Sequence, residues 1–287
     1  MTNSERRSQF ADTQVRRNAR TRDAWELYAV HRGRVTQLLS PTTTNNAAGR
    51  LCVLGAGNGN DLDLPQLTDW YDEVRLVDLD EAALQFAIER QPTPVQAKIV
   101  VNGGVDVTGV LGSLDPLRDP SGHPSGDAPF DASVGALGRR VELDLPGPFE
   151  AVASIGLLTQ LIESAVDLVG REHPRLIEAI AALRAAHLRL LADLLAPGGR
   201  GVLVTELVSS DTFPGLADVA EAALPRVVGE LLAGKNFFSG VNPAVIKSLL
   251  ESDPLSELVR DVEVTLPWRW QFVDRTYAVY AVAFTRR

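Results

Sequence analysis

The sequence is poor in cysteine and lysine and has no long apolar run. Cys52 is the one cysteine among 287 residues, so the chain cannot form an internal disulfide, and a reducing, cytoplasmic setting is favoured. Because Cys52 lies within a short apolar run, we expect a small buried side chain there and not a catalytic thiol.

Lysine occurs only at Lys98, Lys235 and Lys247, the formal net charge is -9 and the pI is about 5.0. Proteins bind nucleic acids largely by neutralising phosphates with Lys and Arg, so we expect no nucleic-acid partner. The N-terminal segment nevertheless carries a basic strip, which indicates a solvated helix face, with an interaction arm as the alternative. Its members are Arg6, Arg7, Arg16, Arg17, Arg20 and Arg22.

No stretch approaches the roughly 18 uninterrupted apolar residues that a membrane helix needs, and the polar start, MTNSERRSQFADTQ, lacks the apolar core of a secretion signal. We therefore expect a soluble chain with no membrane partner. With 45% hydrophobic residues, the length predicts one elaborated domain with a sizeable core. Residues 1–48 are interpreted as an N-terminal helical arm or lid, and residues 49–287 as the main domain.

The stretch around which the sequence is organised is RLCVLGAGNGNDLDL, residues 50–64. An apolar run stops abruptly at Gly55, a pattern typical of a buried parallel strand that ends in a tight turn. Gly55, Gly57 and Gly59 follow at every second position. Glycine tolerates positive φ and lets a ligand approach the backbone, so this loop is predicted to wrap closely around a ligand.

Strand-like and helix-like segments alternate along the rest of the chain. Strands are predicted at 51–54, 74–77, 97–101, 149–155, 201–207, 262–266 and 276–284, and helices at 22–39, 61–70, 81–91, 174–196, 216–233 and 243–251. This alternation predicts an α/β fold, a doubly wound, mostly parallel, seven-stranded Rossmann-like sheet with helices on both faces and a C-terminal antiparallel hairpin. The helix at 22–39 either packs on the sheet or forms a lid that carries Trp25, Tyr28 and His31.

Acidic residues follow the second and third predicted strands. Asp78 lies 19 positions after Gly59, close to the spacing at which a strand-end acid reaches ribose hydroxyls in nucleotide-binding βαβ units. Helix capping is the alternative role, and Asp80 suits it better. Asp106 lies on a glycine-flanked turn. A Gly/Pro-rich insertion follows at about 108–138; we interpret it as a surface excursion and assign no chemistry to its His123.

The spacing G-x-G-x-G departs from the dinucleotide fingerprint G-x-G-x-x-G, because position 60 is Asn. It resembles the first motif of class I S-adenosylmethionine-dependent methyltransferases. The resemblance continues in order through LVDLD, GVDVTG, FEAVASIGLLTQL and LLAPGGRGVLVTEL, and it covers residues 51–284. It implies a Rossmann-like fold, S-adenosylmethionine as the cofactor and methyl transfer as the activity.

The resemblance also implies a set of cofactor-binding residues. The glycine loop contacts the methionine part, Asp78 binds the ribose hydroxyls, and Asp106 with Val107 faces the adenine. The family usually has an acid two positions before the first glycine, which helps to hold the amino group of the cofactor. Here that position is Val53. Asp61, Asp63 or backbone carbonyls are the alternatives for holding this amino group. The full set is Gly55, Ala56, Gly57, Gly59, Asp61, Asp78, Leu79, Asp106, Val107 and Ser154.

Methyl transfer from a sulfonium requires no metal, and it can rely on positioning and desolvation of the nucleophile. Candidates on the acceptor side are Thr159, Gln160 and Glu206, with Ser154 nearby. Trp268 and Trp270 either stack on the acceptor or cover the sheet edge, whereas His173 and His187 are expected to be cap and core residues. The primary hypothesis is O-, N- or C-methylation of a small molecule.

Three alternatives stay open: a protein or peptide acceptor, a non-catalytic S-adenosylmethionine-binding protein and, ranked last because of the glycine spacing, a nicotinamide dehydrogenase. The sequence leaves the acceptor and the oligomeric state open.

Overall fold

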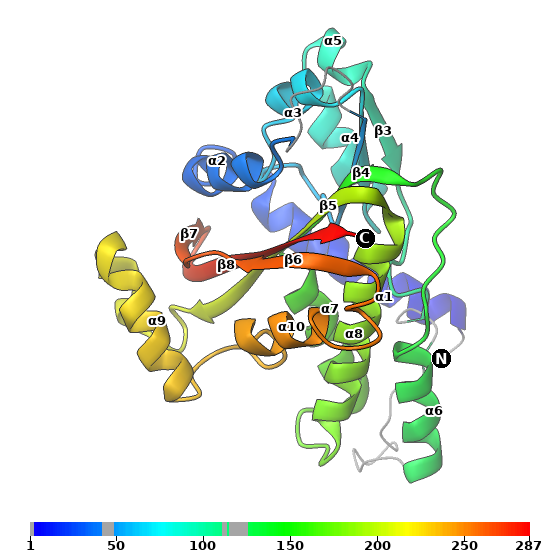
Figure 1. Cartoon of the computed structure of the whole chain (residues 1–287), viewed down its shortest axis with the longest axis vertical. Helices are drawn as coiled ribbons and strands as arrows, with labels where there is room; N and C mark the ends of the chain where they lie inside the picture. The colour runs from blue at the N-terminus through cyan, green and yellow to red at the C-terminus, as the bar shows by residue number, and fades with distance from the viewer. Residues whose placement is uncertain (1–2, 42–48, 111–113, 115–125) are drawn as a thin grey trace.

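The computed structural model describes residues 3–41, 49–110, 114 and 126–287. Within these residues, eight strands form one sheet in the order β3-β2-β1-β4-β5-β8-β6, with β7 paired to β8 (Figure 1). The strands are β1 Arg50–Leu54, β2 Glu73–Val77, β3 Ile99–Asn102, β4 Phe149–Ile155, β5 Leu195–Ser209, β6 Val259–Val264, β7 Trp268–Phe272 and β8 Arg275–Arg286. The first five are joined by parallel pairing, and β8 runs antiparallel to β5, β6 and β7. The predicted mostly parallel sheet with an antiparallel C-terminal hairpin is confirmed, and β7 adds a strand to the predicted seven.

Helices cover both faces of this sheet (Figure 1). They are α1 Asn3–Thr21, α2 Ala29–Leu38, α3 Leu64–Trp70, α4 Glu81–Glu89, α5 Thr93–Gln96, α6 Asp127–Leu137, α7 Leu157–Val169, α8 Leu176–Leu194, α9 Leu224–Ala233 and α10 Pro243–Leu250. Alternate residues of β1 point to two separate cores: Leu51 and Val53 pack with α2, α3 and α4, whereas Cys52 and Leu54 pack with α6, α7, α8 and α10. A parallel strand that is buried on both faces produces this arrangement.

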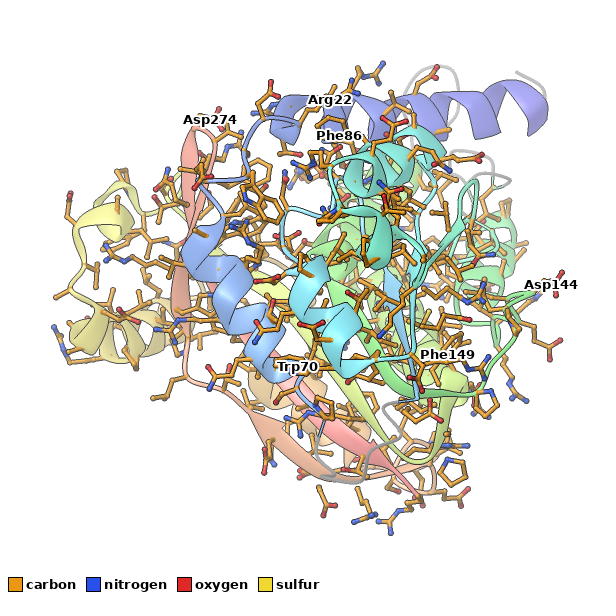
Figure 2. The ribbon with its side chains drawn as sticks, turned by 90° about the horizontal axis from the view of Figure 1, so that it is seen from above. Arg22, Trp70, Phe86, Asp144, Phe149 and Asp274 are labelled. Carbon is orange, nitrogen blue, oxygen red and sulfur yellow. The ribbon has the colours of Figure 1, made fainter. Side chains whose placement is uncertain are left out.

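The N-terminal segment differs from the prediction. The predicted helical arm begins with a regular helix, α1, that was not assigned separately, and the helix expected from residue 22 begins only at Ala29. Trp25 explains the interruption, because the Arg32 guanidinium stacks on its ring at 3.5 Å and holds the intervening turn against the protein. Figure 2 shows α1 lying across this end of the molecule with Arg22 beside Phe86, where the guanidinium is 4.3 Å from the ring centre.

Three further elements were not predicted. The GLLTQL segment begins helix α7, and strand β7 contains Trp268 and Trp270, between the two predicted C-terminal strands. The insertion expected to be a surface excursion contains α6, whose Phe130 is buried and stacks on His173 at 4.5 Å. His123 lies outside the described residues.

Two predicted helix starts, at residues 81 and 243, are confirmed, and each has a side-chain cap. The Asp80 carboxylate accepts a hydrogen bond from the Ala83 N–H at 3.2 Å at the start of α4. The Asn242 side chain likewise accepts from the Ala244 N–H at 3.0 Å at the start of α10. Each cap satisfies an N–H group that has no partner within its own helix.

Two groups that the sequence assigned to the core lie there. Burial raises the pKa of the Cys52 thiol to about 12, so the thiolate required for nucleophilic chemistry is strongly disfavoured. Burial lowers the pKa of His187 to about 4. Among the described helices, none is both long enough and apolar enough to cross a membrane.

Candidate functional site

A cavity of about 650 Å³ lies at the carboxyl ends of the parallel strands. Its wall combines the glycine loop after β1, the residues after β4, the end of β5 and one face of α1. A side recess of about 30 Å³ continues toward the ends of β2 and β3, and it shares Gln14, Gly55, Asp78, Leu157 and Gln160 with the main cavity. Ligands of open α/β sheets bind at this edge, so the cavity has the position expected for an active site.

Two of the three loop glycines line the cavity. Gly55 and Gly57 have positive φ values of +75° and +47°. A Cβ added at Gly55 would stand 2.9 Å from the Leu157 Cβ, and one at Gly57 would stand 3.0 Å from Asn18 Oδ1. Gly59 packs against α4 instead, where an added Cβ would stand 3.0 Å from the Ala87 Cβ. The loop therefore passes tightly between α1 and α7 and presents its backbone to the cavity.

Asp78 is the buried acid of the site. Its Oδ2 accepts a hydrogen bond from the Gly57 N–H and its Oδ1 accepts one from the Asp80 N–H, both at 2.9 Å. The residue is 4% exposed and lines both the cavity and the recess. Burial raises the pKa of this carboxyl to about 6, although the backbone N–H groups oppose the shift. Asp80 caps α4, as the sequence predicted, whereas Asp78 lines the cavity.

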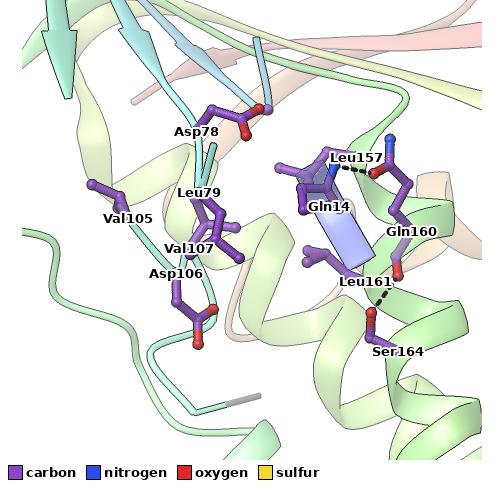
Figure 3. Close-up of a pocket in the computed structure, with 11 residues that line it drawn as sticks. Gln14, Asp78, Leu79, Val105, Asp106, Val107, Leu157, Gln160, Leu161 and Ser164 are labelled. Carbon is purple, nitrogen blue, oxygen red and sulfur yellow. Dashed lines mark hydrogen bonds between the residues drawn. The ribbon is translucent and has the colours of Figure 1, made fainter. Parts of the chain in front are cut away.

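The side recess is a narrow apolar slot with a polar end. Leu79, Val105 and Val107 form one wall, and Leu157 and Leu161 of α7 form the other (Figure 3). Asp106 also lines the slot; its Oδ1 accepts hydrogen bonds from the N–H and hydroxyl groups of Thr108 at 2.9 and 2.6 Å. The predicted adenine-facing residues therefore lie together.

The side chain of Gln14 enters the recess from α1 (Figure 3). Its Nε2 donates a hydrogen bond to Gln160 Oε1 at 2.7 Å, and Gln160 in turn donates to the Gly156 carbonyl at 3.0 Å. Gln160, predicted as an acceptor-side candidate, thus has its side chain engaged in linking α7 to α1.

Glu206 lies at the wide end of the cavity and is 8% exposed. Its Oε2 accepts a hydrogen bond from the Thr159 hydroxyl at 2.5 Å. Burial raises the pKa of the Glu206 carboxyl to about 7; Asp61 adds to the shift, whereas the Thr159 bond and Arg17 reduce it. A carboxyl group that titrates near neutral pH can take up or release a proton during a reaction.

Asp61 and Asp63, the two candidates to replace the acid missing at Val53, have different surroundings. Asp61 lines the cavity, with its Oδ1 3.3 Å from His31 Nε2. Asp63 caps α3 by accepting a hydrogen bond from the Gln66 N–H at 3.1 Å. Of the two, Asp61 is therefore placed to meet a ligand.

Ser154 departs from the predicted cofactor set. Its side chain is fully buried, and its hydroxyl is 2.8 Å from His187 Nε2 on α8. Ser154 belongs to the core beneath β4, and it is not one of the residues that line the cavity. Its position at the end of a strand predicted the correct edge of the sheet, but the face to which its side chain points is set by strand register.

The three residues of the predicted lid also have different surroundings. They are Trp25, Tyr28 and His31. Tyr28 lines the cavity beside Trp270, whereas Trp25 packs against Arg32 and His31 is buried against Trp270. The element that covers the cavity is α1, through Gln14, Arg17, Asn18 and Thr21.

One feature of the sequence could have predicted that α1 lies over the cavity. Asn58 and Asn60 lie in the glycine loop, and their side-chain amides donate to the carbonyls of Asn18 and Thr21 at 2.7 and 2.6 Å. These bonds satisfy carbonyl groups at the end of α1 that the helix itself leaves free. The two asparagines of the GNGN segment thus fasten the helix that covers the cavity.

No protein-family model matches this sequence, and a search of characterised proteins finds no match. Solved structures of similar fold include the N-methyltransferase NodS from Bradyrhizobium japonicum in complex with S-adenosylhomocysteine, with 14% identity, a TM-score of 0.44 and coverage of 89% of this chain and 86% of that one. An S-adenosylmethionine-dependent methyltransferase from Anabaena variabilis has 15% identity, a TM-score of 0.44 and coverage of 100% and 96%. The methyltransferase domain of bacterial CtHen1-C has 14% identity, a TM-score of 0.45 and coverage of 90% and 98%.

The order of the parallel strands, β3-β2-β1-β4-β5, with helices on both faces, is that of a Rossmann-like sheet.

Proposed function

We propose that the chain is an S-adenosylmethionine-dependent methyltransferase that acts on a small molecule. The observation that carries the proposal is a cavity and an adjoining recess, which together are lined by the glycine loop after β1, Asp78 after β2 and Asp106 after β3. The exposed backbone of the glycine loop matches the amino acid part of the cofactor, and the buried carboxylate of Asp78 matches its ribose. The apolar recess with its polar end matches the purine base.

The recess fits the flat base in its chemistry. Val107 and Leu79 on one side and Leu161 on the other offer apolar surface to both faces of a ring (Figure 3), and the Asp106 carboxylate can accept from an exocyclic amine. With Gln14 inside it, the recess measures about 30 Å³, little more than the volume of a water molecule. We therefore expect Gln14 to swing out when the base enters.

The remaining cofactor contacts follow from the same geometry. Asp78 would accept hydrogen bonds from the ribose hydroxyls, a charge-assisted arrangement that fixes orientation. Gly55 and Gly57 would face the methionine part, where a side chain would fill the space. Asp61 would bind the amino group, in place of the acid that the family usually carries at the position of Val53.

The cofactor, when bound, supplies an activated methyl group on a sulfonium. The chain then has to position the acceptor, exclude water and hold a proton where the acceptor releases one. Glu206 suits the last task because it lines the cavity and its carboxyl titrates near neutral pH. Thr159 orients this carboxylate by donating to its Oε2.

The size and cover of the cavity favour a small-molecule acceptor. A volume of about 650 Å³ lies within the range typical of small-ligand sites. Helix α1 covers the opening and is fastened there by an Arg17–Glu163 ion pair and by a hydrogen bond from Asn18 to Asp80 at 3.1 Å. A cavity of this size with a helix along its wall suits a small ligand better than a folded protein.

The proposal is tested with the full chain and S-adenosylmethionine carrying a labelled methyl group. We expect label to appear in members of a small-molecule acceptor library, and S-adenosylhomocysteine, but not NAD, to compete with the cofactor. Label found only in peptides would overturn the small-molecule acceptor, binding without any transfer would support the non-catalytic alternative, and preferential binding of NAD would overturn the cofactor assignment.

A further inference from the structure

Four aromatic rings and one carboxylate gather at the wide end of the cavity. From this arrangement we infer that the acceptor presents a primary or secondary amine to Glu206 between the rings of Tyr28, Trp270 and Tyr277, so that nitrogen is the atom methylated. The inference rests on the proposed function and names the substrate class of the same site.

The rings form a connected wall around Trp270. Its ring centre lies 5.1 Å from that of Tyr28, 5.6 Å from that of Tyr277 and 5.2 Å from that of Phe272, and all four residues line the cavity. The faces of such rings attract ammonium groups, most strongly where water is excluded. Trp270 is 5% exposed, and its buried Nε1 has no hydrogen-bond partner among the described residues.

The carboxylate is accessible from the cavity side. Thr159 donates to Oε2 of Glu206, whereas Oε1 has no side-chain partner in the part of the chain that the structure describes. A Cβ added at Gly156 would stand 3.3 Å from this Oε1 and 4.0 Å from the Trp270 ring. The glycine thus leaves room for a ligand beside both groups.

The charges of the wall favour a cationic ligand. Three of the arginines that line the cavity have acidic partners: Arg17 pairs with Glu163, Arg20 with Asp274 at 3.3 Å, and Arg275 with Asp211 at 3.2 Å; Arg171 is the fourth arginine of the lining. Glu206 has no ion pair with any of these arginines, and Asp61 faces His31. The carboxylates of Glu206 and Asp61 therefore line the cavity without an arginine ion pair among the described residues, and an ammonium group would place a cation beside them.

An amine also suits the chemistry better than an alcohol does. The N–H bond of the bound ammonium breaks, its proton goes to Glu206 Oε1 and its electron pair stays on nitrogen. That pair forms the bond to the methyl carbon, while the pair of the breaking C–S bond stays on sulfur. The product is a methylated ammonium, and Glu206 releases its proton to solvent. An alcohol brings no charge to the rings and holds its proton too tightly for a carboxylate to remove.

The test compares benzylamine with its neutral analogue benzyl alcohol by calorimetry on the full chain, with and without saturating S-adenosylhomocysteine. At about pH 8 we expect benzylamine to bind on the order of tenfold more tightly, because it gains ring and carboxylate contacts. Glu206→Gln should reduce the preference to the part that the rings provide and should retain S-adenosylhomocysteine binding. Glu257→Gln, the same change at an exposed glutamate that does not line the cavity, should leave the preference in place.

Equal binding of the two probes, or a preference of unchanged size in Glu206→Gln, would overturn the inference. A reduced preference in Glu257→Gln would also overturn it, because the net charge of the chain would then be responsible. The titration with S-adenosylhomocysteine distinguishes the two proposals. Absence of S-adenosylhomocysteine binding would contradict the proposed function. Binding of S-adenosylhomocysteine without a preference for benzylamine would contradict only the inference of an amine acceptor.

Discussion

The carboxylate of Asp78 accepts a hydrogen bond from the backbone N–H of Gly57 at 2.9 Å. This bond joins the end of β2 to the loop after β1, and the second oxygen of Asp78 binds the Asp80 N–H in the same way. The acid proposed to bind the ribose therefore also fixes the loop proposed to hold the methionine part, so changes at either residue should affect the same binding step.

We expect Asp78→Asn to weaken S-adenosylhomocysteine binding by about tenfold or more, because an amide offers one acceptor oxygen and turns its NH₂ group toward a backbone donor. Equilibrium dialysis measures the change. Asp72→Asn, an exposed acid just before β2, is the matched control and should bind as the wild type does. Equal affinity in all three proteins would contradict the role of Asp78.

Gly57→Ala should impair the cofactor loop. The φ of +47° disfavours any side chain, and the new Cβ would stand 3.0 Å from Asn18 Oδ1. We expect weaker S-adenosylhomocysteine binding and a free energy of unfolding lower by about 1–2 kcal/mol. The control is Gly229→Ala on the exposed face of α9, where an added Cβ meets nothing within 4 Å; this change should stabilise the chain by up to about 1 kcal/mol. A variant at Gly57 as stable and as tight-binding as wild type would count against the prediction.

Asp61→Asn and Asp63→Asn form a matched pair. Asp61 lines the cavity, so its change should lower the affinity for S-adenosylmethionine, whose amino group it is proposed to bind. Asp63 caps α3; because Asn caps helices about as well as Asp, the second change should leave both affinity and stability nearly unaltered. Equal affinities in the two variants would assign the amino group to backbone carbonyls instead.

Glu206→Gln should change the pH dependence of stability. The folded chain raises the pKa of this carboxyl from 4.5 to about 7, so between these values the folded state binds more protons than the unfolded state. The contribution of Glu206 to the free energy of unfolding is therefore fully present below about pH 4.5 and is lost as pH rises through 7. Its neighbours are Thr159 on α7, Asp61 on the glycine loop and Arg17 on α1.

Glutamine keeps the shape of this side chain without the buried charge. We expect the variant to be more stable than the wild type by roughly 1–3 kcal/mol at about pH 8, and to differ little from it at about pH 4. Urea unfolding at the two pH values measures both differences. If the free energy of unfolding of the variant is lower than that of the wild type by the same amount at both pH values, the Glu206 carboxyl has an ordinary pKa in the folded chain.

The sequence predicted the parts of the fold that local patterns determine. Apolar runs located the five parallel strands, and Asp80 and Asn242 marked helix starts through a side-chain bond to a backbone N–H only a few residues away. The glycine spacing and the strand-end position of Asp78 located the site for the same reason, since the carboxyl ends of parallel strands meet at one edge.

The parts that failed depend on contacts between distant residues. Helix α1 has a polar sequence, and its last turn is held by Asn58 and Asn60, some 40 positions away. Strand β7 exists through its pairing with β8, and two tryptophans after a proline give no period that distinguishes a strand from a loop. Ser154 was placed at the correct edge, but its bond to His187 on α8 depends on packing that a single strand does not reveal.

The most direct test of the central claim is a calorimetric titration of the folded wild-type chain with S-adenosylhomocysteine. The account predicts saturable binding of one molecule per chain, with heat that is strongly reduced in Asp78→Asn. Absence of binding in a sample whose circular dichroism spectrum shows the folded α/β structure would contradict the assignment of the cavity.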